Sequence, residues 1–396
     1  MSENSFTFNA AIRVLILWFA GITAAAQFAK LSLTFSHLQL EYPNTDTSLG
    51  LLVSLIGFIG VFFGMFAGVM ASQVGYKKTL IWGLIIGAIV SIIQSNLLPL
   101  EVMIALRIIE GAAHLAIVVA TPTLMVQTSR QEHAKALMTL WSTFFGVSFV
   151  ITSYLGLPLI ENFGLRSIFL AHAGCMIIAA IFIWKLIPDT KTNIASKFNL
   201  SIENLIREHV EAYRSPSISA PAFGWLFYTL TFVAILTALP LLLPSNEVKL
   251  AAGVLPLIAI FSSFICGAIL IRHFSTIQIL IFAFLGSSLA ILSLTVQDQV
   301  LITLLFLFFL LGLLQSAGFA AIPELNDKIT DQAKSNGGIA QMGNIGTTLG
   351  TPILLAAYSG FGINGVVVFL ASSYALGAAL HILLHYRRQS PPQLEL

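Results

Sequence analysis

Three side chains able to hold a charge or a proton lie within one long apolar segment: Arg107, Glu110 and His114. Their spacing of three and then four residues places them on one face of an α-helix, where Arg107 and Glu110 can pair one turn apart. Ionisable groups cost about 2.5–3.5 kcal/mol each inside a bilayer, so they mark functional sites by default. We expect proton binding at Glu110 under the control of Arg107, with His114 as a relay. The alternatives are a structural ion pair and a packed, hydrogen-bonded histidine.

A second polar pair, Gln27 and Lys30, lies one turn apart in the first apolar segment. If Lys30 and Arg107 both reach a water-filled cavity together with Glu110, its wall holds two cations and one acid. An anionic group on a bound solute would then balance the charge, and a guanidinium suits such a group well. The alternative is that Lys30 extends its ammonium toward the membrane surface.

The second half of the sequence offers hydrogen-bonding side chains instead of charges in the middle of its apolar segments. We expect four of them to line the same cavity, although bonds between helices are the commoner role of such residues. They are Tyr228, Gln315, Gln341 and Asn344. Metal-ligand spacing, a P-loop, a nucleophile elbow and a dinucleotide fingerprint are all missing from the sequence. We therefore expect no metal, no cofactor and no enzymatic activity.

The composition indicates which elements must position these residues. Hydrophobic residues make up 57% of the 396-residue chain, charged residues only 9%, and the mean hydropathy is +0.92; soluble domains carry about 25% charged residues. A net charge of +2 argues against nucleic acid as a partner. A membrane-spanning helix needs about 20 mostly apolar residues. Twelve windows qualify: 11–35, 48–71, 79–99, 102–126, 136–160, 167–187, 221–243, 251–271, 275–296, 300–322, 337–358 and 363–385.

The distribution of lysine and arginine predicts the orientation. With a cytoplasmic N-terminus, fifteen of the nineteen face inward, Arg166 and Lys249 face outward, and Lys30 and Arg107 lie within spans. Both termini are therefore expected in the cytoplasm. The first apolar run has flanks like those of a signal peptide, but its removal would break the pairing of the two halves. We expect a retained helix.

The two sides of a polar linker, 188–220, look related. Gly111 and Pro122 recur as Gly312 and Pro323, each 201 positions later. A repeated set of helices is typical of secondary carriers, which bind their solute between the repeats. We expect an N-terminal six-helix bundle over 1–187, a cytoplasmic linker with a short amphipathic helix over 188–220, and a C-terminal six-helix bundle over 221–396.

Over nearly its whole length the chain resembles the major facilitator superfamily. One family motif is a gating loop between spans two and three, and it is matched by Gly68, Gly75, Lys77 and Lys78. Ser72 and Gln73 stand where the family usually has an acid and a base, which puts the family's gating latch in doubt.

Two further motifs support the resemblance. Arg107 and Gly111 match the family motif of span four, and Gly156 with Pro158 forms a thinned version of the span-five motif of antiporters. The resemblance implies an all-α membrane protein with twelve transmembrane helices in two pseudo-symmetric six-helix bundles.

The resemblance also implies a secondary active transporter that works by alternating access. The charges favour a small anionic or carboxylate-bearing metabolite, for example a siderophore, coupled to protons. A proton-driven multidrug or metabolite efflux carrier is the alternative, and a membrane receptor or sensor without turnover is a remote one. We expect a monomer in the inner (plasma) membrane whose partners are the solute, protons and lipid.

Overall fold

The computed structural model describes residues 8–43, 45–129, 137, 140–189 and 202–389. Within these ranges the regular secondary structure is helical, without strands. Ten of the described helical segments are long and apolar enough to cross a membrane, and Ser48–Gly64 is a shorter apolar helix. The predicted all-α membrane fold is confirmed, while the count of twelve spans stays a prediction.

The first half of the chain, which we define as residues 8–189, forms the helices that carry most of the predicted site. They are α1 (Phe8–Ser32), α2 (Phe35–Glu41), α3 (Asp46–Ser54), the 3-10 turn η1 (Leu55–Gly57), α4 (Phe58–Val74), α5 (Tyr76–Gln94), α6 (Leu100–Gln127), α8 (Phe144–Ile151), the π-helical turn η3 (Thr152–Gly156), α9 (Leu157–Phe163) and α10 (Arg166–Leu186). Their bounds lie within a few residues of the predicted windows, because hydropathy marks the apolar stretch that lipid requires.

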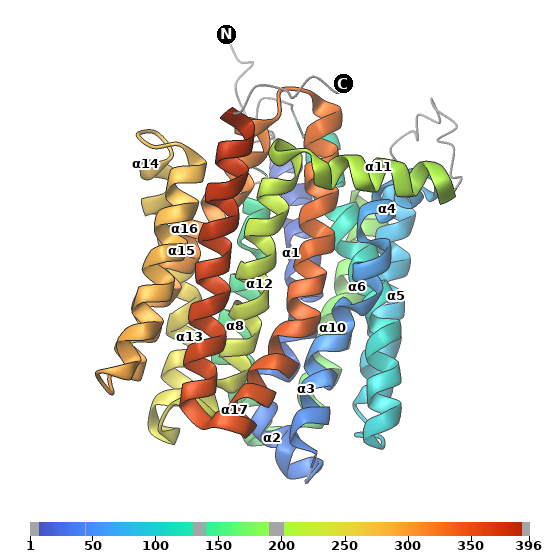
Figure 1. Cartoon of the computed structure of the whole chain (residues 1–396). Helices are drawn as coiled ribbons and strands as arrows, with labels where there is room; N and C mark the ends of the chain where they lie inside the picture. The colour runs from blue at the N-terminus through green and yellow to red at the C-terminus, as the bar shows by residue number, and fades with distance from the viewer. Residues whose placement is uncertain (1–7, 44, 130–136, 138–139, 190–201, 390–396) are drawn as a thin grey trace.

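The linker and the second half, residues 216–389, follow the same pattern. Their helices are α11 (Ile202–Arg214), α12 (Pro216–Leu242), α13 (Ser245–Phe261), the π-helical turn η4 (Ser262–Gly267), α14 (Ala268–Leu270), α15 (Thr276–Leu292), the 3-10 turn η5 (Ser293–Thr295), α16 (Val300–Leu325) and α17 (Ile329–Gln389). α17 is broken at Gly362, whose φ of 60° and ψ of −145° are not helical. The chain reverses there between two helices (Figure 1), which match the last two predicted windows.

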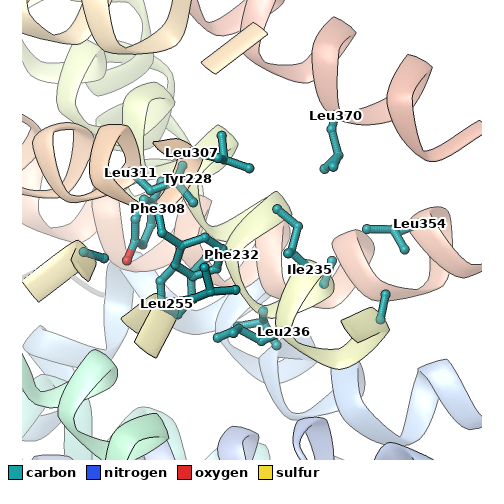
Figure 2. Close-up of a cluster of buried hydrophobic side chains, with 14 of the residues drawn as sticks. Tyr228, Phe232, Ile235, Leu236, Leu255, Leu307, Phe308, Leu311, Leu354 and Leu370 are labelled. Carbon is teal, nitrogen blue, oxygen red and sulfur yellow. The ribbon is translucent and has the colours of Figure 1, made fainter. Parts of the chain in front are cut away.

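The helices stand side by side in one bundle (Figure 1). α1 begins and α17 ends at the same end of this bundle, and α11 lies across that end. In the first half α1 packs against α6, α8 and α10. In the second half α12 packs against α16 and α17, and the aromatic rings of Tyr228, Phe232 and Phe308 lie in its core (Figure 2).

The two halves meet along a seam between α3, η1 and α4 on one side and the first part of α17 on the other. Gly57 faces Asn344 and Thr348 so closely that an added Cβ would lie 2.8 Å from the Asn344 carbonyl oxygen. Glycine at position 57 thus allows the two backbones to approach where a side chain could not.

A second contact between the two halves is an ion pair. Lys249 of α13 pairs with Glu161 of α9 at 2.9 Å.

Candidate functional site

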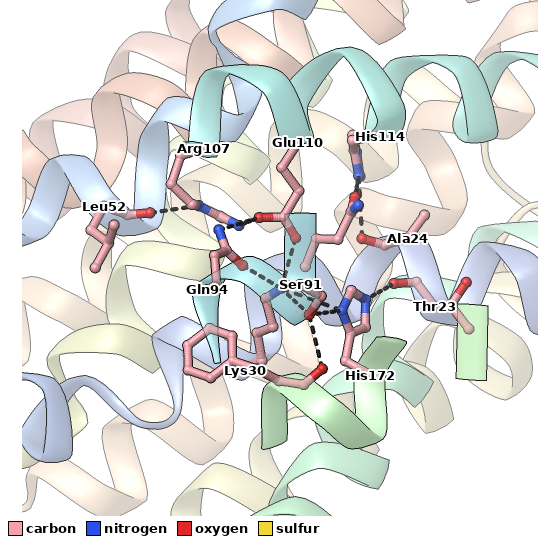
Figure 3. Close-up of polar contacts among 12 residues, drawn as sticks. Thr23, Ala24, Lys30, Leu52, Ser91, Gln94, Arg107, Glu110, His114 and His172 are labelled. Atoms are coloured by element: carbon pink, nitrogen blue, oxygen red, sulfur yellow. Dashed lines mark hydrogen bonds and ion pairs between the residues drawn. The ribbon is translucent and has the colours of Figure 1, made fainter. Parts of the chain in front are cut away.

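Six polar side chains from four helices of the first half meet inside the bundle, and we call them the buried cluster (Figure 3). Each of them is at most 5% exposed. They are Lys30 of α1, Ser91 and Gln94 of α5, Arg107 and Glu110 of α6, and His172 of α10. Because polar groups must find partners when they are removed from water, the contacts among these six define what the site can do.

The Glu110 carboxylate lies at the centre of the buried cluster and uses both of its oxygens. Oε1 accepts from Lys30 Nζ at 2.7 Å, and Oε2 accepts from Arg107 Nη1 at 2.6 Å. Gln94 Nε2 donates a further hydrogen bond to Oε2 at 2.9 Å. Short charge-assisted bonds of this kind stabilise the ionised form of the acid.

Arg107 also reaches the end of α3. Its Nε donates to the Leu52 carbonyl at 2.7 Å, and its Nη2 donates to the Val53 carbonyl at 3.2 Å. The last carbonyls of a helix lack partners within that helix, so a guanidinium is well suited to bind them. Arg107 therefore joins the Glu110 carboxylate of its own helix to α3, the helix that begins the seam.

Lys30 has four acceptors for the three protons of its ammonium. Besides Glu110, they are Gln94 Oε1 at 3.0 Å, Ser91 Oγ at 3.1 Å and His172 Nδ1 at 3.3 Å. Its side chain is 1% exposed. In this conformation Lys30 points into the first half and not toward the membrane surface, contrary to the alternative that the sequence left open.

The water-filled gap expected at Arg107 and Glu110 is closed in this conformation. Both side chains are 0% exposed, and their partners come from α1, α3 and α5 of the first half, not from the second half. The physical reason is that the charges and the nearby carbonyls satisfy one another, so the cluster needs no water. Spacing along α6 could group these residues but could not tell which neighbours they face.

His114 and Gln27 form a separate pair beside the buried cluster. His114 Nδ1 lies 3.0 Å from Gln27 Oε1 and 3.2 Å from the Ala24 carbonyl oxygen. Since both oxygens act here as acceptors, Nδ1 carries a proton. Gln27 Nε2 is buried, and the described residues offer it no hydrogen-bond partner.

An equivalent pair lies in the second half. Tyr228 donates to Gln315 Oε1 at 3.3 Å. Tyr228 follows Gln27 by 201 positions and Gln315 follows His114 by 201 positions, the same offset as between the two glycines of α6 and α16. At this offset Thr231, Phe308 and Leu311 occupy the positions of Lys30, Arg107 and Glu110. The hydrogen-bonded pair therefore recurs, and the charges do not.

Gln341 and Asn344 lie at the seam. Gln341 Nε2 donates to the Val61 carbonyl of α4 at 2.9 Å, and Gln341 Oε1 accepts from Tyr213 of α11 at 2.9 Å. Burial raises the pKa of Tyr213 above its usual value, so its hydroxyl stays protonated and able to donate. Asn344 donates to the Ala340 carbonyl of its own helix at 2.7 Å. Gln341 thus connects three helices, including the linker helix.

The predicted gating loop is almost entirely helical. Gly68 lies in α4, and Lys77 and Lys78 lie in the first turn of α5. Gly75 alone separates the two helices, and its φ of 98° requires glycine. Lys77 pairs with Asp189 at 3.2 Å, an acid beyond α10 that the motif did not indicate.

Sequence reasoning left Ser91 and Gln94 unassigned. Ser91 and Gln94 are three residues apart near the end of an otherwise apolar span, and that spacing places both on one helix face. The spacing of Ser91 and Gln94 could therefore have predicted a polar face on this helix. The Leu52 and Val53 carbonyls could not be found, because a backbone acceptor leaves no mark in the sequence.

A row of aromatic rings, which we call the aromatic row, crosses from the first half to the second. Neighbouring ring centroids within it lie 4.5–6.1 Å apart. It consists of Phe28 of α1, Phe145 and Phe149 of α8, and Phe232, Tyr228 and Trp225 of α12. Within the described residues, no group of three or more His, Cys, Asp and Glu could hold a metal ion.

Comparisons with known proteins agree with this architecture. The chain matches the family model described as Major Facilitator Superfamily over residues 17–245, more than half of its 396 residues. It is 29% identical over 155 residues to proteins called "Multidrug resistance protein MdtG" from Escherichia coli strains SE11 and 55989 / EAEC. The aligned segment is 39% of this chain, and the chain covers 38% of the length of these relatives.

Proposed function

Because this chain belongs to the Major Facilitator Superfamily, we propose that it is a secondary active transporter that carries a small organic solute by alternating access and uses protons to do so. In carriers of this architecture two sets of helices rock around a site near the bilayer midplane. The observation that carries the proton part of the proposal is the buried cluster, in which one carboxylate is held between two cations within the spans.

Proton binding at Glu110 is coupled to conformation by the electrostatics of the cluster. A proton on Glu110 removes the negative charge between Lys30 and Arg107, which then face each other as two buried cations. Leaving a buried charge without its partner costs about 3–5 kcal/mol. The protonated protein therefore favours another arrangement of α1, α5 and α6, and this difference links proton binding to the motion.

The moving parts are the two six-helix bundles, 1–187 and 221–396. The seam around Gly57 and the contact between Glu161 and Lys249 hold them together in this conformation. Alternation requires such contacts to open at one end of the bundle while others close at the opposite end. The seam depends on small residues and hydrogen bonds, which re-form more easily than interlocked side chains do.

The first candidate for the solute is an anionic or carboxylate-bearing metabolite, with siderophores among the examples. The buried cluster contains two cations and one acid, so a carboxylate that reached it after opening would complete the charge balance. A guanidinium and an ammonium both bind carboxylates with charge-assisted hydrogen bonds.

The second candidate is an aromatic or otherwise lipophilic solute carried outward, as in multidrug or metabolite efflux. The aromatic row is the specific observation in its favour, because ring faces bind apolar and cationic solutes. The name of the similar Escherichia coli proteins also points to drugs. We further propose a monomer in the inner (plasma) membrane with both termini in the cytoplasm.

Uptake by proteoliposomes tests the transport proposal. Labelled citrate, glucose and ethidium, tested with and without a pH gradient, represent an anionic, a neutral and an aromatic cationic solute. Wild type should accumulate at least one solute class only with the gradient. Glu110→Gln should lower that uptake about tenfold or more, since the lost pairing exceeds 1.4 kcal/mol, while the control Glu101→Gln, in the exposed first turn of α6, should keep it.

The same assay separates the alternatives. Full, equally pH-dependent uptake by Glu110→Gln would refute the proton role of this acid. Lys30→Met should raise the apparent KM for citrate far more than that for glucose, and equal effects contradict the anion hypothesis. Uptake of ethidium alone favours the second candidate. Binding of a solute without any uptake would indicate a receptor.

A further inference from the structure

His172 is a buried titratable group that the proposed mechanism does not yet use. It lies on α10 and is 5% exposed. Its Nε2 is 3.0 Å from the Thr23 carbonyl oxygen, and its Nδ1 is 2.9 Å from Ser91 Oγ and 3.3 Å from Lys30 Nζ (Figure 3). Both ring nitrogens therefore have partners, on two different helices.

The partners determine which nitrogen carries the proton of the neutral ring. The Thr23 carbonyl can only accept a hydrogen bond, so Nε2 must donate to it. Nδ1 of the neutral ring then carries a lone pair directed at Ser91 and Lys30. An ammonium can only donate, so Lys30 supplies a proton toward His172 just as it does toward Glu110.

The surroundings can hold the doubly protonated ring as well. Ser91 Oγ lies 3.0 Å from the Phe169 carbonyl oxygen and donates its single proton there. Its oxygen can then accept from a protonated Nδ1 at 2.9 Å. Both N–H groups of a charged His172 would thus have acceptors, and the nearby Lys30 ammonium is the group that opposes this state.

We infer that His172 is a second proton-accepting group of the buried cluster and exchanges a proton with Glu110 through Lys30. A proton that arrives at His172 first forms an N–H bond at Nδ1. An N–H bond of Lys30 then breaks as an O–H bond forms on Glu110, and the Nδ1–H bond breaks as Lys30 regains its proton. At the end Lys30 is again an ammonium, His172 is neutral, and the cluster holds one additional proton on Glu110.

This inference rests on the proposed proton coupling, and its geometry is specific. The charged groups that act on His172 are Lys30 from α1 and Glu110 and Arg107 from α6, and the neutral Ser91 of α5 contacts its ring. Lys30 lies between the two acceptors, 2.7 Å from Glu110 Oε1 and 3.3 Å from His172 Nδ1. Within this set, Lys30 is the group that contacts both.

Nitrogen NMR of purified protein with labelled histidine tests the exchange without any solute. His172→Gln identifies the signal of His172, and His385, which lies near the end of α17, serves as the internal control. In wild type the His172 signal should show a neutral ring protonated at Nε2. Lys30→Met removes the facing cation, so the ring should become doubly protonated over a wider pH range. An unchanged His172 signal in Lys30→Met would overturn the inference.

Transport separates this inference from the proposal on which it rests. Driven uptake is measured with a pH gradient and exchange at equal pH, for whichever of citrate, glucose and ethidium is carried. In His172→Gln driven uptake should fall about a hundredfold, as when a positioned proton acceptor is lost, while exchange continues; His385→Gln should keep both. If His172→Gln keeps the same ratio of driven uptake to exchange as wild type, the inference about His172 is overturned but the proposed proton coupling is not. A wild-type ratio in Glu110→Gln overturns the proton coupling itself.

Ser91→Ala serves as the second variant if His172→Gln does not fold. It retains the imidazole but removes the acceptor for a protonated Nδ1. Driven uptake should then reach its half-maximum at a lower pH, since the charged ring is less well held. An unshifted pH profile in Ser91→Ala contradicts a proton on Nδ1.

Discussion

Glu110 receives hydrogen bonds from Lys30, Gln94 and Arg107, so its two oxygens stabilise three neighbours at once. The three ionised groups do not contribute equally to stability. Removal of Glu110 leaves two cations close together, whereas removal of Lys30 leaves the neutral pair of Arg107 and Glu110. The arrangement itself therefore ranks the substitutions.

Glu110→Gln should lower the free energy of unfolding by about 3–5 kcal/mol, because two buried cations lose their partner. Adding Lys30→Met should restore part of this loss, since one unpaired cation is gone and the two changes are coupled. Thermal unfolding of the single and double variants in detergent measures the difference. Additive losses would mean that Lys30 and Glu110 do not interact.

Lys249→Met provides the control for this pair of variants. Lys249 and Glu161 are 56% and 53% exposed, and ion pairs in such positions contribute about 0–1 kcal/mol. A loss as large as that of Glu110→Gln would show that exposure does not determine the value of charge pairs in this molecule.

At the scale of elements, the seam depends on glycines that leave no room for a Cβ. Gly57→Ala should push the first part of α17 away from η1, because the added carbon meets the Asn344 carbonyl oxygen and the Thr348 hydroxyl. Overpacking of this kind costs about 1–3 kcal/mol. A cysteine at Thr348, with Cys175 and Cys266 replaced by alanine, should then react faster with a water-soluble maleimide. Gly174→Ala, with no heavy atom within 4 Å of the added carbon, should leave the rate unchanged.

The Tyr213 hydroxyl joins the linker helix to the same seam. Tyr213→Phe removes the hydrogen bond to Gln341, a contact that contributes about 1 kcal/mol on average. Hydrogen exchange over α11 should therefore become several-fold faster. Tyr358→Phe, one turn before the break in α17 at Gly362, is the control and should leave this exchange unchanged. Equal exchange in wild type and Tyr213→Phe would show that α11 is held by other contacts.

Much of the helix pattern could be predicted from the sequence, since apolar length alone determines what can cross lipid. The break at Gly362 agrees with the predicted separation of the windows 337–358 and 363–385. The direction in which each helix face points could not be predicted. Spacing grouped Arg107 with Glu110, but nothing in α6 shows that both turn toward α1 and α5. The partners of Gln341 likewise depend on how three helices meet.

At the scale of the whole molecule, α1 begins and α17 ends at one end of the bundle (Figure 1). The lysine and arginine bias predicts that this end is cytoplasmic. A fluorescent protein fused to the C-terminus should therefore be bright, and alkaline phosphatase fused at the same place should be inactive. The reverse result would invert the orientation and, with it, the direction in which protons meet His172 and Glu110.

Thr231, Phe308 and Leu311 occupy in the second half the places that Lys30, Arg107 and Glu110 hold in the first. If both halves descend from one duplicated ancestor, their later histories diverged: one copy kept or gained the ionisable trio, and the other became free to vary its lining. Exchanging residues 221–396 for those of a related carrier should then leave the proton dependence of transport unchanged, as measured by uptake into proteoliposomes with and without a pH gradient.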